Sequence, residues 1–312
     1  MMHFPRLIEE LFTIRDWLRF TVSQFEEAGL FYGHGTDNSY DEAVWLIMGA
    51  LHLPHETLNN FLDAVITEKE RKQLAHLIEQ RITKRVPTAY LLREAYLRGF
   101  KFYVDERVIV PRSFIAELLD FNDHGEHGLQ PWIEHPELIN SAADICTGSG
   151  CLGILLANAF PDATIDVVDI SLDAIAVANI NIKHYELQDQ ITAIASDMFT
   201  NLKGPDGKPK TYDLIISNPP YVDAPSMAKL PIEYRNEPQI ALGSGADGLE
   251  HTHTILREAA KHLNEAGILV VEIGHNRAVL EAAYPKLNFT WLAVTTGSQF
   301  VFLLTKEQLK YN

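Results

Sequence analysis

Apolar residues recur at helical spacing through the amino-terminal part of the chain. Between residues 4 and 28 the apolar positions lie three or four residues apart, so a helix would carry them on one face. The same spacing returns in residues 41–53 and 61–86. Residues 1–90 therefore predict a small helical domain. The first apolar face is formed by Leu7, Leu11, Ile14, Leu18, Val22 and Phe25.

The pattern changes to alternation after Pro87. Aromatic and β-branched residues alternate with polar ones over residues 91–112, which predicts a β-hairpin that links two domains. A polar connector rich in His, Gly and Pro follows over residues 122–137. The apolar positions of the predicted hairpin are Phe100, Phe102, Val104, Val108 and Val110.

Short branched runs alternate with helical stretches over residues 113–312. Strands that alternate with helices form a mainly parallel sheet with helices on both faces, so we predict a doubly wound, Rossmann-like α/β domain. The predicted strands are 142–146, 164–169, 191–195, 213–217 and 268–273, with a terminal strand pair over 289–304. The predicted helices are 114–120, 152–160, 173–185 and 254–263, and residues 223–238 form a proline-containing loop placed to cover a cleft.

A glycine-rich turn follows the first predicted strand of this domain. Gly148, Gly150 and Gly153 spell the pattern G-x-G-x-x-G. Glycines let a backbone approach a ligand closely, and the helix that begins near Cys151 presents free N–H groups. Taken alone, the pattern predicts dinucleotide binding and an NAD-dependent oxidoreductase. Asp169, which ends the next strand, would bind ribose hydroxyls in this and in other nucleoside sites.

Carboxylates mark three successive strands. Asp144 enters the glycine turn, and Asp169 and Asp197 end the second and third strands. Because the carboxyl ends of parallel strands meet at one edge of the sheet, these groups should face one crevice. Three acidic groups suit a cationic nucleoside better than a pyrophosphate, and Asp197 is placed to recognise an adenine amino group.

The fourth strand ends in Asn218-Pro219-Pro220-Tyr221. Asn and Pro are common turn residues, so a plain turn is one interpretation. The other is a clamp for a planar amino group, in which the Asn218 oxygen and the Pro219 carbonyl accept its two hydrogens and the Tyr221 ring fixes its plane. A poor nitrogen nucleophile needs this geometry for attack.

Charge and composition narrow the class of partner. The chain has 312 residues, of which 26 are basic and 42 acidic, so its formal charge is −16. This balance repels nucleic-acid backbones and favours a basic protein partner. Cys146 and Cys151 lie inside the glycine turn and are interpreted as reduced thiols.

The sequence shows no recognisable targeting segment and no metal-ligand motif. We found no apolar run of membrane-spanning length and no signal peptide in the sequence, so a cytoplasmic protein without membrane association is expected. No metal site is predicted either, because the histidines have no ligand partners at metal spacing. Solvated or core-packed histidines are the interpretation for His34, His251, His253 and His275.

The motifs together resemble a known family. The sequence is similar to S-adenosylmethionine-dependent methyltransferases that modify glutamine side-chain amides in translation proteins, and most similar to the branch that methylates the third protein of the large ribosomal subunit. Tyr32-Gly-His-Gly-Thr-Asp-Asn38 and Arg112-Ser113 are typical of that branch. The release-factor branch usually continues Pro-Arg with Pro-Asp/Glu-Thr-Glu, so Glu117 is not carried over as a site residue. The other matching stretches are 87–90, 102–104, 144–150, 168–171, 196–197, 218–221, 237–238, 245–249 and 272–274.

The resemblance implies a role for each motif. Asp144, Thr147, Gly148, Ser149 and Gly150 would hold the amino-acid part of S-adenosyl-L-methionine. Asp169 would bind its ribose, Asp197 and Met198 would flank its adenine, and Asn218 would border it. Asn218, Pro219, Pro220 and Tyr221 would hold the substrate amide, with Asn218, Pro219 and Tyr221 as the catalytic set. Arg112 is either a further substrate-binding residue or a surface cation, and Cys146 stands where the family often has glycine.

The implied partner is a basic ribosomal protein, free or in an assembling ribosome, docked by the helical domain. Three alternatives remain open besides the oxidoreductase. One is methylation of a peptide-release factor, and another is an adenine-N6 DNA methyltransferase, which shares the Asn-Pro-Pro-Tyr tetrad but would need a basic cleft. A non-catalytic ribosome-assembly binder is the third, and it would leave the donor loop and the tetrad unexplained.

Overall fold

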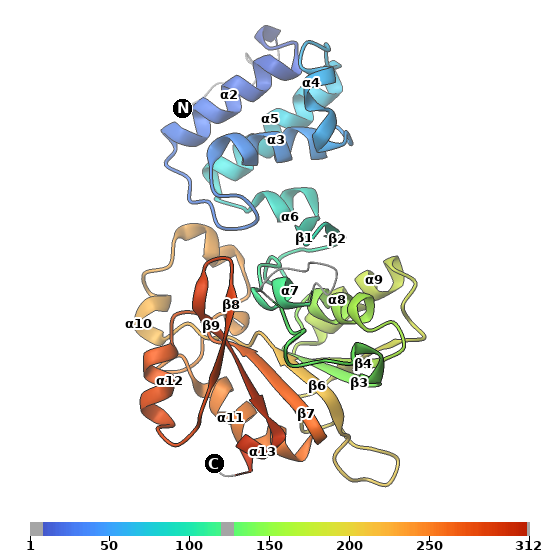
Figure 1. Ribbon diagram of the computed structural model, residues 1–312. Helices are drawn as coiled ribbons and strands as arrows, with labels where there is room; N and C mark the ends of the chain where they lie inside the picture. Colours follow the sequence, from blue (N-terminus) through green and yellow to red (C-terminus); the bar gives the residue numbers. More distant parts are fainter. Residues whose placement is uncertain (1–8, 120–127, 311–312) are drawn as a thin grey trace. The chain divides into compact units, whose positions relative to one another are not determined.

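The computed structural model describes residues 9–119 and 128–310, and the chain forms two compact units (Figure 1). Leu7 of the first predicted helix face and residues 122–127 of the predicted connector lie outside the described residues. The first unit contains Met1–Ala95, Val104–Glu106 and Pro231–Glu237; the second contains Tyr96–Tyr103, Arg107–Leu230 and Pro238–Asn312.

The first unit is helical, as the periodicity predicts. Ile14, Leu18 and Phe25 of the predicted apolar face are buried, and Trp17 joins them with no exposed surface. Thr13 caps the first long helix through a capping box with Asp16, which explains why the helix begins there. The helices are α2 (Ile14–Glu27), α3 (Ser39–Ala50), α4 (Leu58–Phe61), α5 (Glu68–Thr83) and α6 (Thr88–Leu92), with a 3-10 turn η1 (His55–Thr57).

The predicted hairpin is shorter than the alternation suggested. Strands β1 (Ala95–Leu97) and β2 (Phe100–Phe102) pair with each other, but Val104, Val108 and Val110 lie outside them. Each of these three valines is almost completely buried. Their apolar character therefore reflects separate core contacts rather than a strand ladder.

The second unit is built on a mostly parallel sheet, and in the described residues its strand order is β5-β4-β3-β6-β7-β9-β8. The first five strands in that order pair in parallel, and β9 pairs antiparallel with β7 and β8. This confirms the predicted Rossmann-like architecture and the terminal strand pair. The strands are β3 (Ser141–Ile145), β4 (Thr164–Asp169), β5 (Ile191–Ala195), β6 (Tyr212–Ser217), β7 (Leu263–Glu272), β8 (Thr290–Val294) and β9 (Gly297–Thr305).

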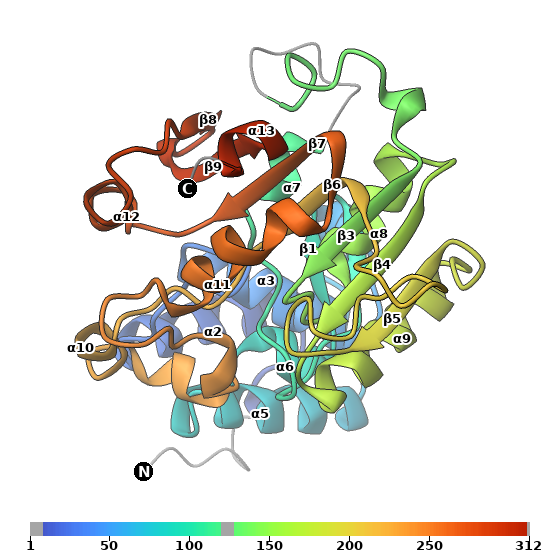
Figure 2. The same ribbon diagram turned by 90° about the horizontal axis from the view of Figure 1, so that it is seen from below.

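Helices cover both faces of the sheet (Figure 2). On one face, α8 (Cys151–Ala159) and α9 (Leu172–His184) pack on β3, β4 and β5. A Cβ at Gly153 would lie 2.2 Å from Val167 Cγ1, so glycine is what lets α8 approach the sheet. On the other face, the buried cluster includes residues of α11 (Glu250–Glu258), α12 (Arg277–Ala283) and α13 (Lys306–Leu309).

The remaining elements are short. The helix predicted over 254–263 begins earlier, at Glu250, and its end continues as a 3-10 turn. None of the helices in the described ranges combines the length and the apolar character that crossing a membrane requires. The short elements are α7 (Ile115–Leu118), η2 (Pro136–Leu138), α10 (Ala224–Met227), η3 (Ile232–Asn236), η4 (Gln239–Ala241) and η5 (Ala259–Lys261).

The strand order creates a topological switch point between β3 and β6. From β3 the chain builds outward through β4 to β5, and it then returns to place β6 on the other side of β3. The loops after β3 and β6 therefore leave the same edge of the sheet in opposite directions, which opens a crevice between them. These two loops carry the glycine turn and the Asn-Pro-Pro-Tyr tetrad.

Candidate active site

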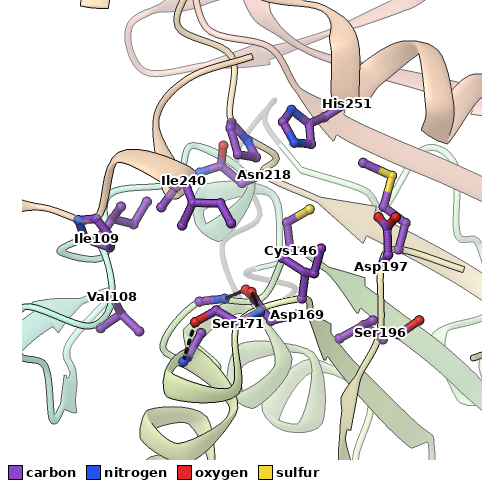
Figure 3. Close-up of a pocket in the computed structure, with 18 of the residues that line it drawn as sticks. Val108, Ile109, Cys146, Asp169, Ser171, Ser196, Asp197, Asn218, Ile240 and His251 are labelled. Carbon is purple, nitrogen blue, oxygen red and sulfur yellow. Dashed lines mark hydrogen bonds between the residues drawn. The ribbon is translucent and has the colours of Figure 1, made fainter. Parts of the chain in front are cut away.

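A pocket lies at this edge of the sheet, within the second unit (Figure 3). Four strand ends contribute to it: Cys146 and Gly148 after β3, Asp169 at the end of β4, Asp197 after β5 and Asn218 after β6. Figure 3 shows Asn218, Cys146 and Asp169 facing the same space. The other lining residues are Arg107, Val108, Ile109, Val168, Ile170, Ser171, Ala174, Ser196, Met198, Pro220, Pro238, Ile240, Ala241 and His251.

The glycine turn presents its backbone to the pocket. Gly148 has a φ of +57°, and no atom lies within 4 Å of the position that a Cβ would take there. Gly150 lies behind it, close to Ala178 of α9. Ser149 turns its carbonyl toward α9, where the Asn181 amide donates to it over 2.8 Å. Of the turn itself, Gly148 is therefore the residue that is open to a ligand.

Cys146 has a left-handed backbone, with a φ of +64°. Such a conformation costs a residue with a side chain on the order of 1 kcal/mol. This explains why glycine suits the position and why a small side chain is still accepted. Met198, another pocket residue, is likewise left-handed with a φ of +44°.

Asp144 lies beneath the glycine turn and does not line the pocket. It has no exposed surface, and its Oδ2 accepts hydrogen bonds from the Thr147 hydroxyl and from the Gly153 N–H at 3.1 Å. Burial raises its pKa to about 7, although these two donors act in the opposite direction. Asp144 therefore supports the turn from below, together with its hydrogen-bond partner Thr147.

Asp169 holds the turn from the pocket side. Its Oδ2 accepts from the Gly148 N–H and its Oδ1 from the Ser171 N–H, each over 2.9 Å. Burial raises the pKa of this carboxyl, and the N–H donors partly offset that effect. Each oxygen retains acceptor capacity for a ligand hydroxyl, because a carboxylate oxygen accepts more than one hydrogen bond.

Asp197 and Met198 stand at the end of β5, as the sequence predicts, and His251 joins them in the pocket. His251 Nδ1 lies 2.8 Å from the Ser244 hydroxyl, and burial lowers its pKa. The helix predicted over 254–263 leaves residue 251 outside it, so His251 was interpreted as a solvated or core-packed histidine and was not expected in the pocket. Since α11 begins at Glu250, His251 stands in the first helical turn and reaches the pocket.

The tetrad after β6 is partly in the pocket. Asn218 and Pro220 line it, Asn218 is half-buried and Pro219 is buried beside it. Tyr221 is held from behind, since its ring lies against Gly274 and its carbonyl accepts from the Asn276 amide over 2.7 Å. Pro219 and Tyr221 are therefore next to the pocket rather than in its wall.

Arg112 is not among the pocket-lining residues. Its Nη1 lies 3.4 Å from the Val110 carbonyl oxygen, and the chain segment that does reach the pocket is Arg107–Ile109. The neighbouring Ser113 has a clear structural role, because its hydroxyl donates to Glu272 Oε2 over 2.7 Å. The Phe114 N–H donates to the same oxygen over 2.8 Å.

Replacing Glu272 by glutamine is expected to weaken the dependence of stability on pH. Burial raises the pKa of Glu272 from its ordinary value of 4.5 to about 7, against the lowering effect of its hydrogen bonds. This carboxyl therefore stabilises the fold fully below its unfolded pKa, and that contribution is lost as the pH rises through the folded pKa. Urea unfolding between about pH 5 and pH 8 should show the variant gaining on the wild type as the pH rises. Parallel curves for the two proteins would contradict this expectation, since Asp144 titrates in both.

The described residues contain no group of three or more His, Cys, Asp or Glu side chains arranged for a metal ion. A pocket at a switch point of the sheet, a glycine turn after β3 and an Asn-Pro-Pro-Tyr loop after β6 define a Rossmann-like methyltransferase. The family model of the methyltransferase small domain matches residues 122–230, and that of the PrmC N-terminal domain matches residues 16–92.

Family membership rests on relatives that align over almost the whole chain. The ribosomal protein uL3 glutamine methyltransferase of Neisseria gonorrhoeae is 58% identical over 98% of both chains. The proteins of the same name from Neisseria meningitidis serogroup A and Burkholderia pseudomallei are 56% and 51% identical, over 99% and 95% of both chains. The chain therefore belongs to the family of ribosomal protein uL3 glutamine methyltransferases. The resemblance found in the sequence is confirmed, and the protein is an enzyme. The oxidoreductase interpretation of the glycine turn has no support among these relatives.

Proposed function

We propose that the protein transfers a methyl group from S-adenosyl-L-methionine to the side-chain amide nitrogen of a glutamine in ribosomal protein uL3. The observation that carries the proposal is the place of Asn218, which borders the pocket that contains Asp169 and Asp197. A group that can hold an amide thus stands beside groups that suit a cationic nucleoside. The names of the relatives supply the substrate.

The pocket residues fit this donor. Gly148 offers an open approach to its backbone, Asp169 has acceptor capacity for ribose hydroxyls, and Asp197 with Met198 suits the adenine. Thr147, Ser149 and Gly150 shape the turn, and Asp144 supports it from below. We therefore propose Gly148, Asp169, Asp197 and Met198 as contacts, with the other four as the scaffold of the donor loop.

The chemistry needs positioning more than a base. When bound, the donor would supply a methyl group on a sulfonium sulfur, which leaves as a neutral thioether when its bond to the methyl carbon breaks. The Asn218 oxygen and the Pro219 carbonyl would accept the two hydrogens of the substrate amide, so that its nitrogen lone pair points out of the amide plane. The ring of Tyr221 would fix that plane beside Pro220. The nitrogen would release one proton to water only as the new C–N bond forms, so alignment supplies most of the rate.

The substrate is expected to dock on the helical residues 1–90, with residues 91–112 as a linker and 113–312 as the methyltransferase domain. The formal charge of −16 favours a basic ribosomal protein, free or in an assembling ribosome, and disfavours DNA. Arg112 remains a proposed substrate contact, because it follows the pocket segment Arg107–Ile109 by only three residues. We therefore propose a cytoplasmic location for the enzyme.

Mass spectrometry of purified uL3 incubated with the enzyme and labelled donor tests this function. One added methyl group on a glutamine is the expected product. A peptide-release factor and a duplex with unmethylated adenines serve as the competing substrates. Methylation of either one in place of uL3 would overturn the assignment.

Replacing Gly274 by alanine is expected to lower kcat/KM for the glutamine substrate by about tenfold to a hundredfold. The new Cβ would lie 2.6 Å from Cε2 of Tyr221, so the ring would have to leave the plane in which it fixes the amide. Gly207→Ala is the matched control, because Gly207 also has a positive φ but open space around its Cβ position. Equal activities of the two variants in a labelled-methyl assay would argue that the Tyr221 ring has no such role.

A further inference from the structure

The segment Pro231–Glu237 belongs to the helical unit although its neighbours on both sides belong to the second unit. The chain leaves the second unit after Leu230 and returns to it at Pro238. This is the middle of the loop that follows the tetrad.

Glu233 fixes the segment by its charge. Its side chain is 3% exposed, and its Oε1 accepts from the Phe31 N–H over 3.1 Å. The same oxygen lies 3.5 Å from Arg81 Nη1 and 3.4 Å from Arg85 Nη1. A buried carboxylate with two cationic partners and a backbone donor is a strong anchor, because removal of one partner leaves a buried charge uncompensated.

Arg81 connects this anchor to the core of the helical unit. Its side chain is 1% exposed, its Nε donates to Glu42 of α3 and its Nη2 donates to the Phe31 carbonyl over 2.9 Å. Glu42 also accepts from the Thr88 hydroxyl over 2.8 Å. Glu42 and Glu233 therefore share Arg81, one from a helix and the other from the segment.

The stretch Tyr32–Asn38, which the methyl-transfer chemistry does not use, forms the second part of the anchor. The Tyr234 ring lies 4.6 Å from that of His34 between centroids, and His34 Nε2 lies 3.6 Å from Glu237 Oε2. A Cβ at Gly33 would come within 3.1 Å of the Tyr234 hydroxyl oxygen. The small residue at position 33 thus leaves room for Tyr234.

Both ends of the segment lead directly to the site. The Val222 N–H donates to the Leu242 carbonyl and the Ser244 N–H donates to the Val222 carbonyl, each over 2.9 Å. These bonds close a loop whose base is next to Tyr221. Between Glu237 and this base, Pro238, Ile240 and Ala241 form part of the pocket wall. The tip of the loop is anchored in one unit, and its base is part of the pocket in the other.

We propose that Glu233 is a positioning residue for methyl transfer: by holding the tip of the 222–242 loop, it sets the wall Pro238–Ala241 and the approach to Tyr221. The proposal rests on the proposed function for its catalytic readout. Glu233 itself touches neither reacting group. On one side its effect passes along the chain through residues 234–237 to Pro238, and the loop base carries it to the tetrad.

Glu233→Gln tests the proposal, because it keeps the size of the side chain and removes its charge. Trypsin cleavage after the exposed Arg235 reports release of the segment, and we expect it to be about tenfold faster in the variant. Calorimetry should show a Kd for S-adenosyl-L-methionine raised about threefold, and kcat/KM for the glutamine substrate should fall about tenfold. Asn236→Ala, which removes a 2.9 Å hydrogen bond to the Arg85 carbonyl, is the milder variant if Glu233→Gln fails to fold.

Two glutamate variants serve as controls. Glu68→Gln alters an exposed pair with Lys72 and should leave all three readouts unchanged. Glu42→Gln removes a charge from the same buried cluster but not from the segment, so it should lower the melting temperature without changing the donor Kd.

Three results would overturn the proposal: wild-type cleavage in Glu233→Gln, faster cleavage with donor Kd and kcat/KM unchanged, or equal changes in donor Kd for Glu42→Gln and Glu233→Gln. A wild-type enzyme that binds the donor but leaves uL3 unmodified would refute the proposed substrate instead. In that case the rate of trypsin cleavage and the donor Kd of Glu233→Gln would still test the role of Glu233.

Discussion

Asn218→Ala is expected to lower kcat/KM for the glutamine substrate by about a hundredfold to a thousandfold, the usual cost of one missing group that holds a transition state. The variant loses the side-chain oxygen at the end of β6 that would accept a hydrogen from the substrate amide. The donor Kd should change by less than about threefold, because the carboxylates of Asp169 and Asp197 remain. Labelled-methyl transfer measures the first quantity and calorimetry the second.

Asn218→Asp tests whether the side chain matters as a hydrogen-bond acceptor or only by filling the space at position 218. It retains an acceptor oxygen, so we expect it to keep more activity than Asn218→Ala. Two results would count against the amide clamp. One is full turnover by Asn218→Ala, and the other is loss of donor binding that accounts for the whole drop in activity.

Asp169→Ala should raise the donor Kd by about tenfold to a hundredfold, since a hydrogen bond to a charged group contributes roughly 1.5–3 kcal/mol. The substitution removes the acceptor proposed for the ribose. It also frees the Gly148 and Ser171 N–H groups, which the carboxylate holds over 2.9 Å. Calorimetric titration with S-adenosyl-L-methionine measures the effect.

Asp166→Asn is the matched control on the same strand. Asp166 is also buried, but its carboxylate pairs with Lys210 and Tyr212 and does not line the pocket. It should lower stability and leave the donor Kd unchanged. If both variants weaken donor binding to the same extent, Asp169 would act by stabilising the strand and not by contacting the donor.

Several features could be predicted because their cause is local in the chain. The apolar face that contains Ile14, Leu18 and Phe25 follows from helical spacing alone. The strand over 213–217 was predicted from a branched run that two prolines end, and β6 spans Tyr212–Ser217. The alternation of strands and helices then implied parallel pairing, and with it the meeting of the strand ends.

Other features depended on contacts between distant residues. The family resemblance implies that Asp144 helps to hold the donor, and the structure places its side chain under the turn, where it accepts from the Gly153 N–H. His251 and Ile240 enter the pocket from parts of the chain in which no motif marked them. Periodicity reports which residues are buried, and it does not report which strand end a distant loop will reach.

The sequence by itself determined the class of fold, the order of the motifs and the chemistry of the strand ends, because these depend on spacing and residue type. The tertiary structure decided which of those groups line the pocket and which support it from behind. It also decided that the segment Pro231–Glu237 joins the helical unit, through the burial of Glu233 and Arg81 and the half-buried Arg85 beside them. Burial of a charge depends on partners brought together by the whole fold, and no local pattern in the chain encodes it.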